Sequence, residues 1–333
     1  MSTTMTLAPD IGSSTVTPHL YGMLYASAGH EQHSNLEAGA LDPLDIYVRN
    51  AATVAKSARA AGMEFSLVTN DPARIAQILK RRGLDGAIEL TPHDFTLDVP
   101  EGIPFRSAHF KLDLIDAFGR GEYGDFVGLI DIDLVICEPI RCDDPNALYV
   151  YDIWAENPYC EDDAAHVANL MELLGDGAMP TQWFGGEFIV GHRDVFTRLS
   201  AEIKAMWPTY IAQVGKWKHV GDEMLVNAAI QKLMRQGGRI VNAGPEGLGM
   251  VVRWWSRRTN GKMRPWTEAA KCAIMHLPGD KQFLATIAEH GFDKTGFLVA
   301  HRKHAGRRAR IAQVRNLIDR MRFRKPPYAP QMR

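Results

Sequence analysis

Two aspartates, Asp131 and Asp133, stand one residue apart in the otherwise apolar run of residues 126–136. On an extended chain, residues i and i+2 point to the same side, so these carboxylates repel each other unless a cation lies between them or one keeps its proton. Apolar flanks predict a buried strand, where an unpaired carboxylate is strongly unfavourable. The pattern therefore predicts that Asp131 and Asp133 bind a divalent metal ion.

The residues before this run alternate between strand-like and helix-like patterns. We expect strands at residues 19–26, 64–69 and 87–90, and helices at 45–61, 72–82 and 107–118. Asn70, Asp71 and Pro72 supply a capping residue and a first-turn proline for the second helix, and Gly83 ends it. The alternation predicts an α/β fold, Rossmann-like, with a mostly parallel central sheet flanked by helices, whose ligands lie beyond the carboxyl ends of the strands.

The pattern is looser after the acidic run. We expect strands at 147–154, 187–190 and 272–275, and helices at 164–174, 193–206 and 222–235. A tight turn at Gly185–Gly186 is expected before the strand at 187–190. The first 17 residues are rich in Ser and Thr and lack an apolar block, which indicates a disordered leader.

Composition excludes several classes of protein. The chain has 333 residues, of which 46% are hydrophobic and 23% charged, as in a soluble globular protein. Its four cysteines show no Cys-x-x-Cys spacing, so we expect neither a disulfide framework nor a zinc site, and a cytoplasmic location. No segment approaches the roughly 18 continuous apolar residues that span a bilayer. No nucleic-acid-binding module is recognisable, so nucleic acid is not an expected partner.

Three further motifs follow the acidic run in a fixed order. They are Trp183-Phe184-Gly185-Gly186-Glu187, then Gly221-Asp222-Glu223-Met224-Leu225-Val226-Asn227, then His276-Leu277-Pro278-Gly279-Asp280-Lys281. With the Asp-Ile-Asp sequence, this order resembles the retaining GT-A glycosyltransferases, among them bacterial lipooligosaccharide galactosyltransferases, glycogenin and the blood-group transferases. The resemblance covers roughly residues 19–285 by motif order.

The resemblance implies a metal-dependent enzyme that transfers a hexose from a nucleotide sugar, a UDP-sugar by preference, to a glycan or glycolipid of the cell surface with retention of configuration. It implies a GT-A catalytic domain at residues 18–295, with a nucleotide-binding half to about residue 136 and a half for acceptor and donor sugar after it. It also implies that Asp131, Asp133 and His276 hold the metal. An imidazole beside carboxylates suits Mn²⁺, with Mg²⁺ as the alternative ion.

The same resemblance assigns the remaining site residues. Asp222 and Glu223 match the acidic pair beside the anomeric carbon, although acids also favour a helix N-terminus by about 0.3–1 kcal/mol. Gly279 and Lys281 would contact the diphosphate, but the family's lysine usually stands one residue later and precedes Pro-Trp. Five more residues are expected to contact the donor: Tyr25, Lys111, Gly185, Gly186 and Glu187. For Lys111 the alternative is a solvated lysine, and for Gly185 and Gly186 it is a plain turn.

Three other interpretations remain open from the sequence. Haloacid-dehalogenase-like phosphatases also carry Asp-x-Asp, but on the strand that usually opens the domain, whereas three strand–helix units precede it here. A transferase-like scaffold could bind a glycan or nucleotide without turnover, which the intact acids at 131, 133, 222 and 223 argue against. The acids could also lie on an edge strand and face water.

The C-terminal end has a different charge from the rest. Residues 301–333 contain 11 Lys and Arg against one acid, while the other 300 residues contain 27 bases and 38 acids. At helical spacing, Ile311, Val314, Leu317, Ile318 and Met321 form an apolar stripe among arginines. Residues 296–333 are therefore predicted to form a basic amphipathic tail that binds an anionic membrane surface, on the inner face of the plasma membrane. Packing of the stripe on the domain is the alternative.

Overall fold

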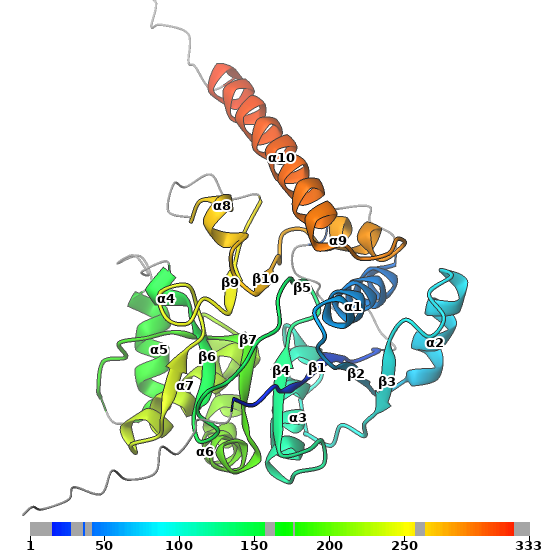
Figure 1. The fold of residues 1–333 in the computed structure, drawn as a ribbon. Coiled ribbons are helices and arrows are strands. Elements are labelled where there is room, and N and C mark those ends of the chain that lie inside the picture. Colours follow the sequence, from blue (N-terminus) through cyan, green and yellow to red (C-terminus); the bar gives the residue numbers. More distant parts are fainter. Residues whose placement is uncertain are drawn as a thin grey trace, which may run out of the picture.

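A seven-stranded sheet forms the centre of the protein, seen in a computed structural model that describes residues 15–27, 36, 42–156, 164–175, 177–256 and 264–322 (Figure 1). The strand order is β3-β2-β1-β4-β7-β6-β8. The strands are β1 (His19–Leu24), β2 (Phe65–Thr69), β3 (Glu89–Pro92), β4 (Phe126–Ile130), β6 (Leu148–Asp152), β7 (Phe184–His192) and β8 (Ile240–Asn242).

Most neighbouring strands of this sheet are parallel. β3, β2, β1 and β4 run in one direction, β6 and β8 are parallel to each other, and only β7 is antiparallel to its neighbours β4 and β6. The predicted α/β fold with a mostly parallel sheet is confirmed. Because β4 pairs with β1 and β7, the strand that leads to the acids is central, and the edge-strand interpretation is wrong.

Helices cover both faces of the sheet (Figure 1). On one face, α1 (Pro43–Ala60) packs against α2 (Pro72–Arg81), and on the other α3 (Lys111–Gly119), α6 (Arg193–Ala212) and α7 (Asp222–Arg235) pack in a row. Asp71 caps α2, since its side chain accepts a hydrogen bond from the Arg74 amide at 2.9 Å. Gly83 follows that helix with φ +67°, a conformation that glycine adopts without strain.

The acidic run differs from the single strand expected at 126–136. β4 ends at Ile130, and β5 (Leu134–Ile136) belongs to a second sheet of order β5-β10-β9, with β9 at Val251–Arg253 and β10 at Ile274–His276. Val135 packs with Val252 and Met275 in a second small core. Both halves of the run are buried and apolar, so periodicity could not reveal that they serve two sheets.

Two other expectations about local structure are wrong. Gly185 and Gly186 lie inside β7 rather than in a tight turn, and neither has a positive φ. α6 continues to Ala212, past Pro208, where the sequence pattern ended the helix at residue 206. Two helices, α5 (Ala164–Leu174) and α7, begin and end as expected. The sequence did not predict five short elements: α4 (Ile153–Glu156), α8 (Trp266–Ala269), α9 (Lys281–Ile287), β8 and β9.

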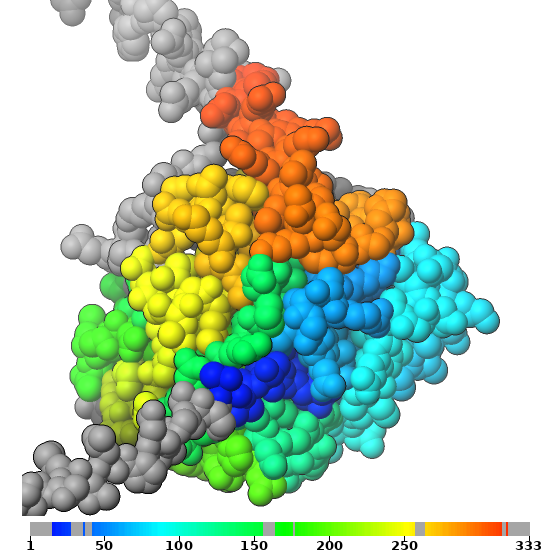
Figure 2. All heavy atoms as spheres, in the orientation of Figure 1, coloured from blue at the N-terminus to red at the C-terminus, as the bar shows by residue number. Residues whose placement is uncertain are grey.

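The C-terminal helix α10 (Lys294–Arg322) has two different halves. In the first half, Phe297, His301 and Ala305 are buried against the body of the protein. In the second half, Ile311, Val314 and Ile318 are exposed, so the alternative that this stripe packs on the domain does not hold for them. Figure 2 shows the helix extending away from the body. No helix within the described part of the chain has the length and hydropathy needed to cross a bilayer.

Some expectations lie partly outside the described residues. The leader is described only from residue 15, and Val16 there exchanges two backbone hydrogen bonds of 2.9 Å with Cys142. The tail is described to residue 322. Cys137, Cys142 and Cys272 are buried, and Cys160 lies outside the described residues.

Candidate active site

A cavity of about 860 Å³ opens at the carboxyl ends of β1 and β4. Its volume is within the range of about 300–1,000 Å³ that is usual for small-molecule sites. Its walls come from the end of β1, the start of α1, the β4–β5 connection, β7, the start of α7 and the segment from β10 to α9. The position agrees with the expectation that ligands lie beyond the carboxyl ends of parallel strands.

Asp131, Asp133 and His276 meet at the floor of this cavity. Each offers a ligand atom, and these atoms lie within 4.8 Å of one another. His276 Nε2 is 3.0 Å from an Asp133 oxygen and 3.5 Å from an Asp131 oxygen. The pairing of β10 with β5 sets His276 opposite Leu134, and the Leu277 amide donates to the Asp133 carbonyl at 2.9 Å. Two carboxylates and one imidazole form a donor set that fits a divalent ion such as Mn²⁺.

Two lysines neutralise the acids. Lys281 Nζ donates to an Asp133 oxygen, and Lys111 Nζ lies 2.6 Å from an Asp131 oxygen. Burial opposes ionisation of Asp133, but Lys281 and His276 outweigh it and hold the pKa of that carboxyl well below its ordinary value. At Asp131, burial dominates over Lys111 and His276, and the pKa is raised. The two acids therefore have different environments although they are neighbours in sequence.

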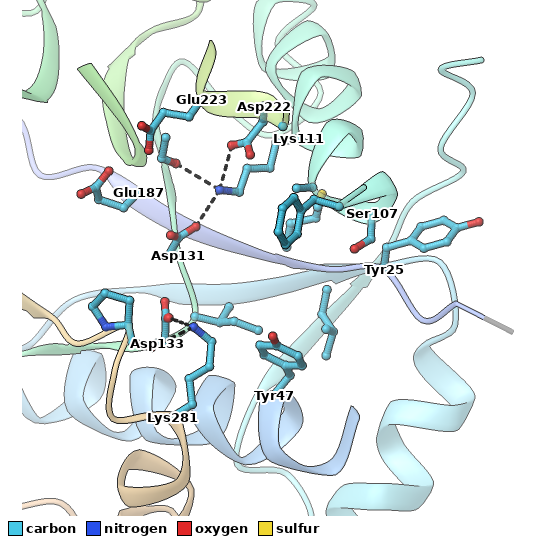
Figure 3. A pocket seen from close by; sticks show the side chains of 18 of the residues that line it. Tyr25, Tyr47, Ser107, Lys111, Asp131, Asp133, Glu187, Asp222, Glu223 and Lys281 are labelled. Atoms are coloured by element: carbon cyan, nitrogen blue, oxygen red, sulfur yellow. Dashed lines mark hydrogen bonds and ion pairs between the residues drawn. The ribbon is translucent and has the colours of Figure 1, made fainter. Parts of the chain in front are cut away.

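Lys111 also connects the metal acids to the start of α7. Its Nζ lies 3.0 Å from an Asp222 oxygen, a contact drawn in Figure 3. It also donates to the Gly186 carbonyl at 3.2 Å. The alternative of a solvated lysine does not hold, since the Lys111 side chain is 14% exposed. Asp222 and Glu223 occupy the first turn of α7, after Gly221 with φ +147°. Both line the cavity.

A second charged cluster lies around Arg253, which also lines the cavity. Its guanidinium contacts Glu187 at 2.6 and 2.7 Å and Glu223 at 3.0 Å. Glu223 also accepts from the Trp183 indole at 2.7 Å. Burial opposes ionisation of Glu187, but Arg253 and His276 lower the pKa of this carboxyl to about 2. Both Glu187 oxygens are therefore engaged by Arg253, inside the protein.

Glu187 also faces the metal-site histidine. His276 Nδ1 is buried, makes no hydrogen bond among the described residues and lies 3.5 Å from a Glu187 oxygen. A carboxylate on this side favours a proton on Nδ1 and leaves Nε2 directed at the two aspartates. The sequence motif placed Glu187 near the donor sugar, and the structure places it next to His276.

The other expected donor contacts have varied positions. Tyr25 lines the cavity and stacks on Phe110 with ring centroids 4.2 Å apart. Gly186 lines the cavity, whereas Gly185 and Gly279 are not among its lining residues. A Cβ at Gly279 would lie 3.4 Å from Trp255, an ordinary contact. Sequence reasoning gave Arg253 no role, because the strand that carries it was not expected, and it missed further lining residues, among them Tyr47, Ser107, His219 and Ser27.

Gly185 and Gly186 are required by side chains of the protein itself. A Cβ at Gly185 would lie 1.8 Å from a Glu187 oxygen and 2.9 Å from Arg253, and a Cβ at Gly186 would lie 2.5 Å from an Asp222 oxygen. We expect Gly185→Ala to lower the free energy of unfolding by about 1–3 kcal/mol, because the Glu187–Arg253 pair must move. Urea unfolding measures this, with Gly215→Ala as the control, since a Cβ there meets nothing within 4 Å. Equal stability of the two variants would contradict the assignment.

The fold is that of the GT-A glycosyltransferases. The likeness to WbbM supports this assignment of the fold, and LgtC is a second similar structure. The apo structure of WbbM, a bifunctional glycosyltransferase, aligns with a TM-score of 0.50 and 15% identity over 81% of this chain and 46% of that chain, so the match spans less than half of WbbM. The galactosyltransferase LgtC, in complex with donor and acceptor sugar analogues, aligns with a TM-score of 0.44 and 15% identity over 80% of this chain and 95% of that chain. No family model and no curated protein matches the sequence.

Proposed function

We propose that this protein is a metal-dependent glycosyltransferase that moves a hexose from a UDP-sugar to a glycan or glycolipid acceptor with retention of configuration. The observation that carries the proposal is the cluster of Asp131, Asp133 and His276 in the large cavity of a GT-A fold. The ion, Mn²⁺ or Mg²⁺, would be held by these three residues and would supply Lewis-acid stabilisation of the departing diphosphate. Lys281 adds positive charge on the same side of the cavity.

The acids at the start of α7 have separable roles in this proposal. Both oxygens of Glu223 have partners, Trp183 and Arg253, which suits an orienting group. The Asp222 carboxylate pairs with Lys111 and adjoins Gly186 on the cavity wall. We therefore assign Asp222 to the anomeric centre, where a carboxylate either attacks the sugar or stabilises an oxocarbenium-like state. Lys111 pairs with both this carboxylate and Asp131, and so fixes the distance between the two acids.

Donor binding and donor hydrolysis test the proposal. We expect Mn²⁺ together with UDP-hexoses to raise the Tm, because a ligand that binds only the folded state stabilises it according to its occupancy. UDP-, GDP- and CMP-sugars are compared at equal concentration, with and without Mn²⁺, and released nucleotide is measured in parallel. A phosphatase would cleave phosphate monoesters instead, and a scaffold would bind without release of nucleotide. Either result contradicts the transferase assignment.

The proton on His276 makes metal affinity depend on pH. Burial lowers the pKa of His276, but Asp133, Glu187 and Asp131 outweigh it and raise the value to about 9. A metal ion binds the neutral imidazole, so below that pH one proton must leave and Mn²⁺ affinity rises by up to about tenfold per pH unit. In the metal-free protein, the charged imidazole of His276 stabilises the folded state. This stabilisation is complete below the ordinary pKa of 6.5 and is lost as pH rises through about 9.

Calorimetric titration with Mn²⁺ at pH 6.5 to 8.5, in buffers of different ionisation enthalpy, measures the number of protons released. The Tm of the metal-free protein is recorded over the same pH interval. Mn²⁺ affinity that does not change with pH would contradict His276 as a ligand.

We further propose that the second half of α10 binds an anionic membrane surface on the cytoplasmic side, close to a lipid-linked acceptor. The support is the exposed stripe of Ile311, Val314 and Ile318 on a helix rich in arginine. Co-flotation with vesicles of anionic lipid, but not of neutral lipid, tests this attachment. Loss of flotation in a variant with serine at these three positions would identify the surface.

A further inference from the structure

The first half of α10 packs directly behind the metal site, through a carboxylate that the proposed chemistry does not use. Asp280 immediately precedes α9 and is 0% exposed. Its amide donates to the Leu277 carbonyl at 2.9 Å and its carbonyl accepts from the Leu284 amide at 2.9 Å, so the backbone at this point is fixed. Asp280 is not among the residues that line the cavity, and it adjoins Lys281, which is.

The Asp280 side chain joins three segments that are distant in sequence. Ser256, just after β9, donates its hydroxyl to one oxygen. From α10, His301 Nε2 and His304 Nε2 each lie 3.1 Å from an Asp280 oxygen, and Arg308 lies 3.7 Å away. Burial opposes ionisation, but the hydrogen bonds from His301, His304 and Ser256 outweigh it and hold the pKa of Asp280 well below its ordinary value. A buried anion with this many donors fixes the position of all of them.

Aromatic packing surrounds the same point. His301 is 0% exposed, stacks on Phe297 with an interplanar angle of 6°, and accepts from the Trp266 indole at 3.0 Å. Trp254, the residue after β9, meets the His301 ring edge-on at 5.4 Å. His304 stacks on Phe283 of α9 at 4.5 Å. The first half of α10 is therefore part of the folded body, in contrast to the exposed half that follows.

The segment held by Asp280 supplies two partners of the metal acid Asp133. His276 lies four residues before Asp280 and Lys281 one residue after it, and their nitrogen atoms contact the two different oxygens of Asp133. On the other side, Ser256 follows Arg253, which holds Glu187 and Glu223. A shift of the segment that carries Asp280 moves His276 or Lys281 relative to Asp133.

We propose that Asp280 is a positioning residue that, by anchoring the first half of α10, holds His276 and Lys281 in the geometry for binding a metal–nucleotide complex. This inference rests on the proposed function, because it assigns Asp280 to the same site. The proposal divides α10 into a first half that supports the site and an exposed second half that can bind a membrane surface. Removal of a group that orients a metal ligand typically weakens binding by about 10–100-fold.

Calorimetric titration of the full-length protein with UDP in the presence of Mn²⁺ tests the proposal. We expect Asp280→Asn to raise the Kd by at least about tenfold with unchanged stoichiometry, and excess Mn²⁺ to restore occupancy. A role in folding alone would lower the stoichiometry and leave the Kd unchanged. Hydrogen–deuterium exchange over residues 294–310 should increase in the same variant, because α10 loses its anchor.

A milder variant covers the case in which Asp280→Asn does not fold. His304 is only partly buried, and His304→Ala removes one donor to Asp280. The matched control is Lys303→Ala, an exposed neighbour on the same helix. We expect His304→Ala to raise the Kd as well. An unchanged Kd in His304→Ala, or in a folded Asp280→Asn, with wild-type binding intact, overturns this inference and leaves the proposed function standing. A wild-type protein that binds neither Mn²⁺ nor UDP overturns both.

Discussion

Asp133→Asn is expected to abolish Mn²⁺ binding and to lower donor turnover by about 1,000-fold or more, because a Lewis-acid metal contributes several kcal/mol to the transition state. Each oxygen of Asp133 has a charged or titratable partner, His276 on one and Lys281 on the other. An amide retains the shape of the side chain but not the negative charge that a divalent ion requires. The seven-stranded sheet does not depend on this residue, so the fold should persist.

The variant should also have a lower Tm without metal, because Lys281 and His276 lose their buried anion. Asp125→Asn is the control, since Asp125 is an exposed acid just before the same strand and pairs only with exposed Arg193 among the described contacts. Circular dichroism establishes that both variants are folded, and titration with Mn²⁺ and release of UDP from the donor give the result. Near-normal turnover in Asp133→Asn would refute the metal assignment.

Arg253→Met is expected to lower the free energy of unfolding by about 3–5 kcal/mol, the usual cost of leaving a buried charge without its partner. Arg253 holds two carboxylates, Glu187 with a side chain 0% exposed and Glu223 with one 18% exposed. In the wild-type protein the lowered pKa of Glu187 gives stability that is complete above its ordinary value of 4.5 and is lost as pH falls towards about 2. Without Arg253, burial instead favours the protonated form, so the deficit should shrink from pH 7 to pH 5.

Urea unfolding at both pH values measures the effect. Arg239→Met is the control, because Arg239 pairs with Asp144 but its side chain is 70% exposed, and such pairs contribute about 1 kcal/mol or less. Adding Glu187→Gln to Arg253→Met should recover part of the loss by removing one unpaired charge. An Arg253→Met variant no less stable than the control would show that the two glutamates do not need this cation.

The sequence was sufficient for the elements whose signals are local. Asp71, Pro72 and Gly83 marked both ends of α2, and the acids at 222 and 223 marked the start of α7, because caps, proline and charge near a helix terminus act within one turn. The parallel strands before the acidic run were also predictable from alternating apolar segments. These features depend only on neighbours along the chain.

What the sequence could not supply depends on contacts between distant residues. Nothing in residues 126–136 indicates that the run divides between two sheets, since the division is set by pairing with β10 about 140 residues later. The glycines at 185 and 186 suggested a turn, but their reason is the space taken by Glu187 and Asp222. Arg253 could be identified only once both of its carboxylate partners were in place.

The metal acids lie between the two sheets, and this location has a consequence for the apo and loaded forms. Asp131 follows a strand of the large sheet, while His276 ends a strand of the small one. A bound ion would thus connect the seven-stranded sheet to the three-stranded sheet. Bound metal is then expected to slow proteolysis of the carboxy-terminal third, which carries the small sheet's strands β9 and β10.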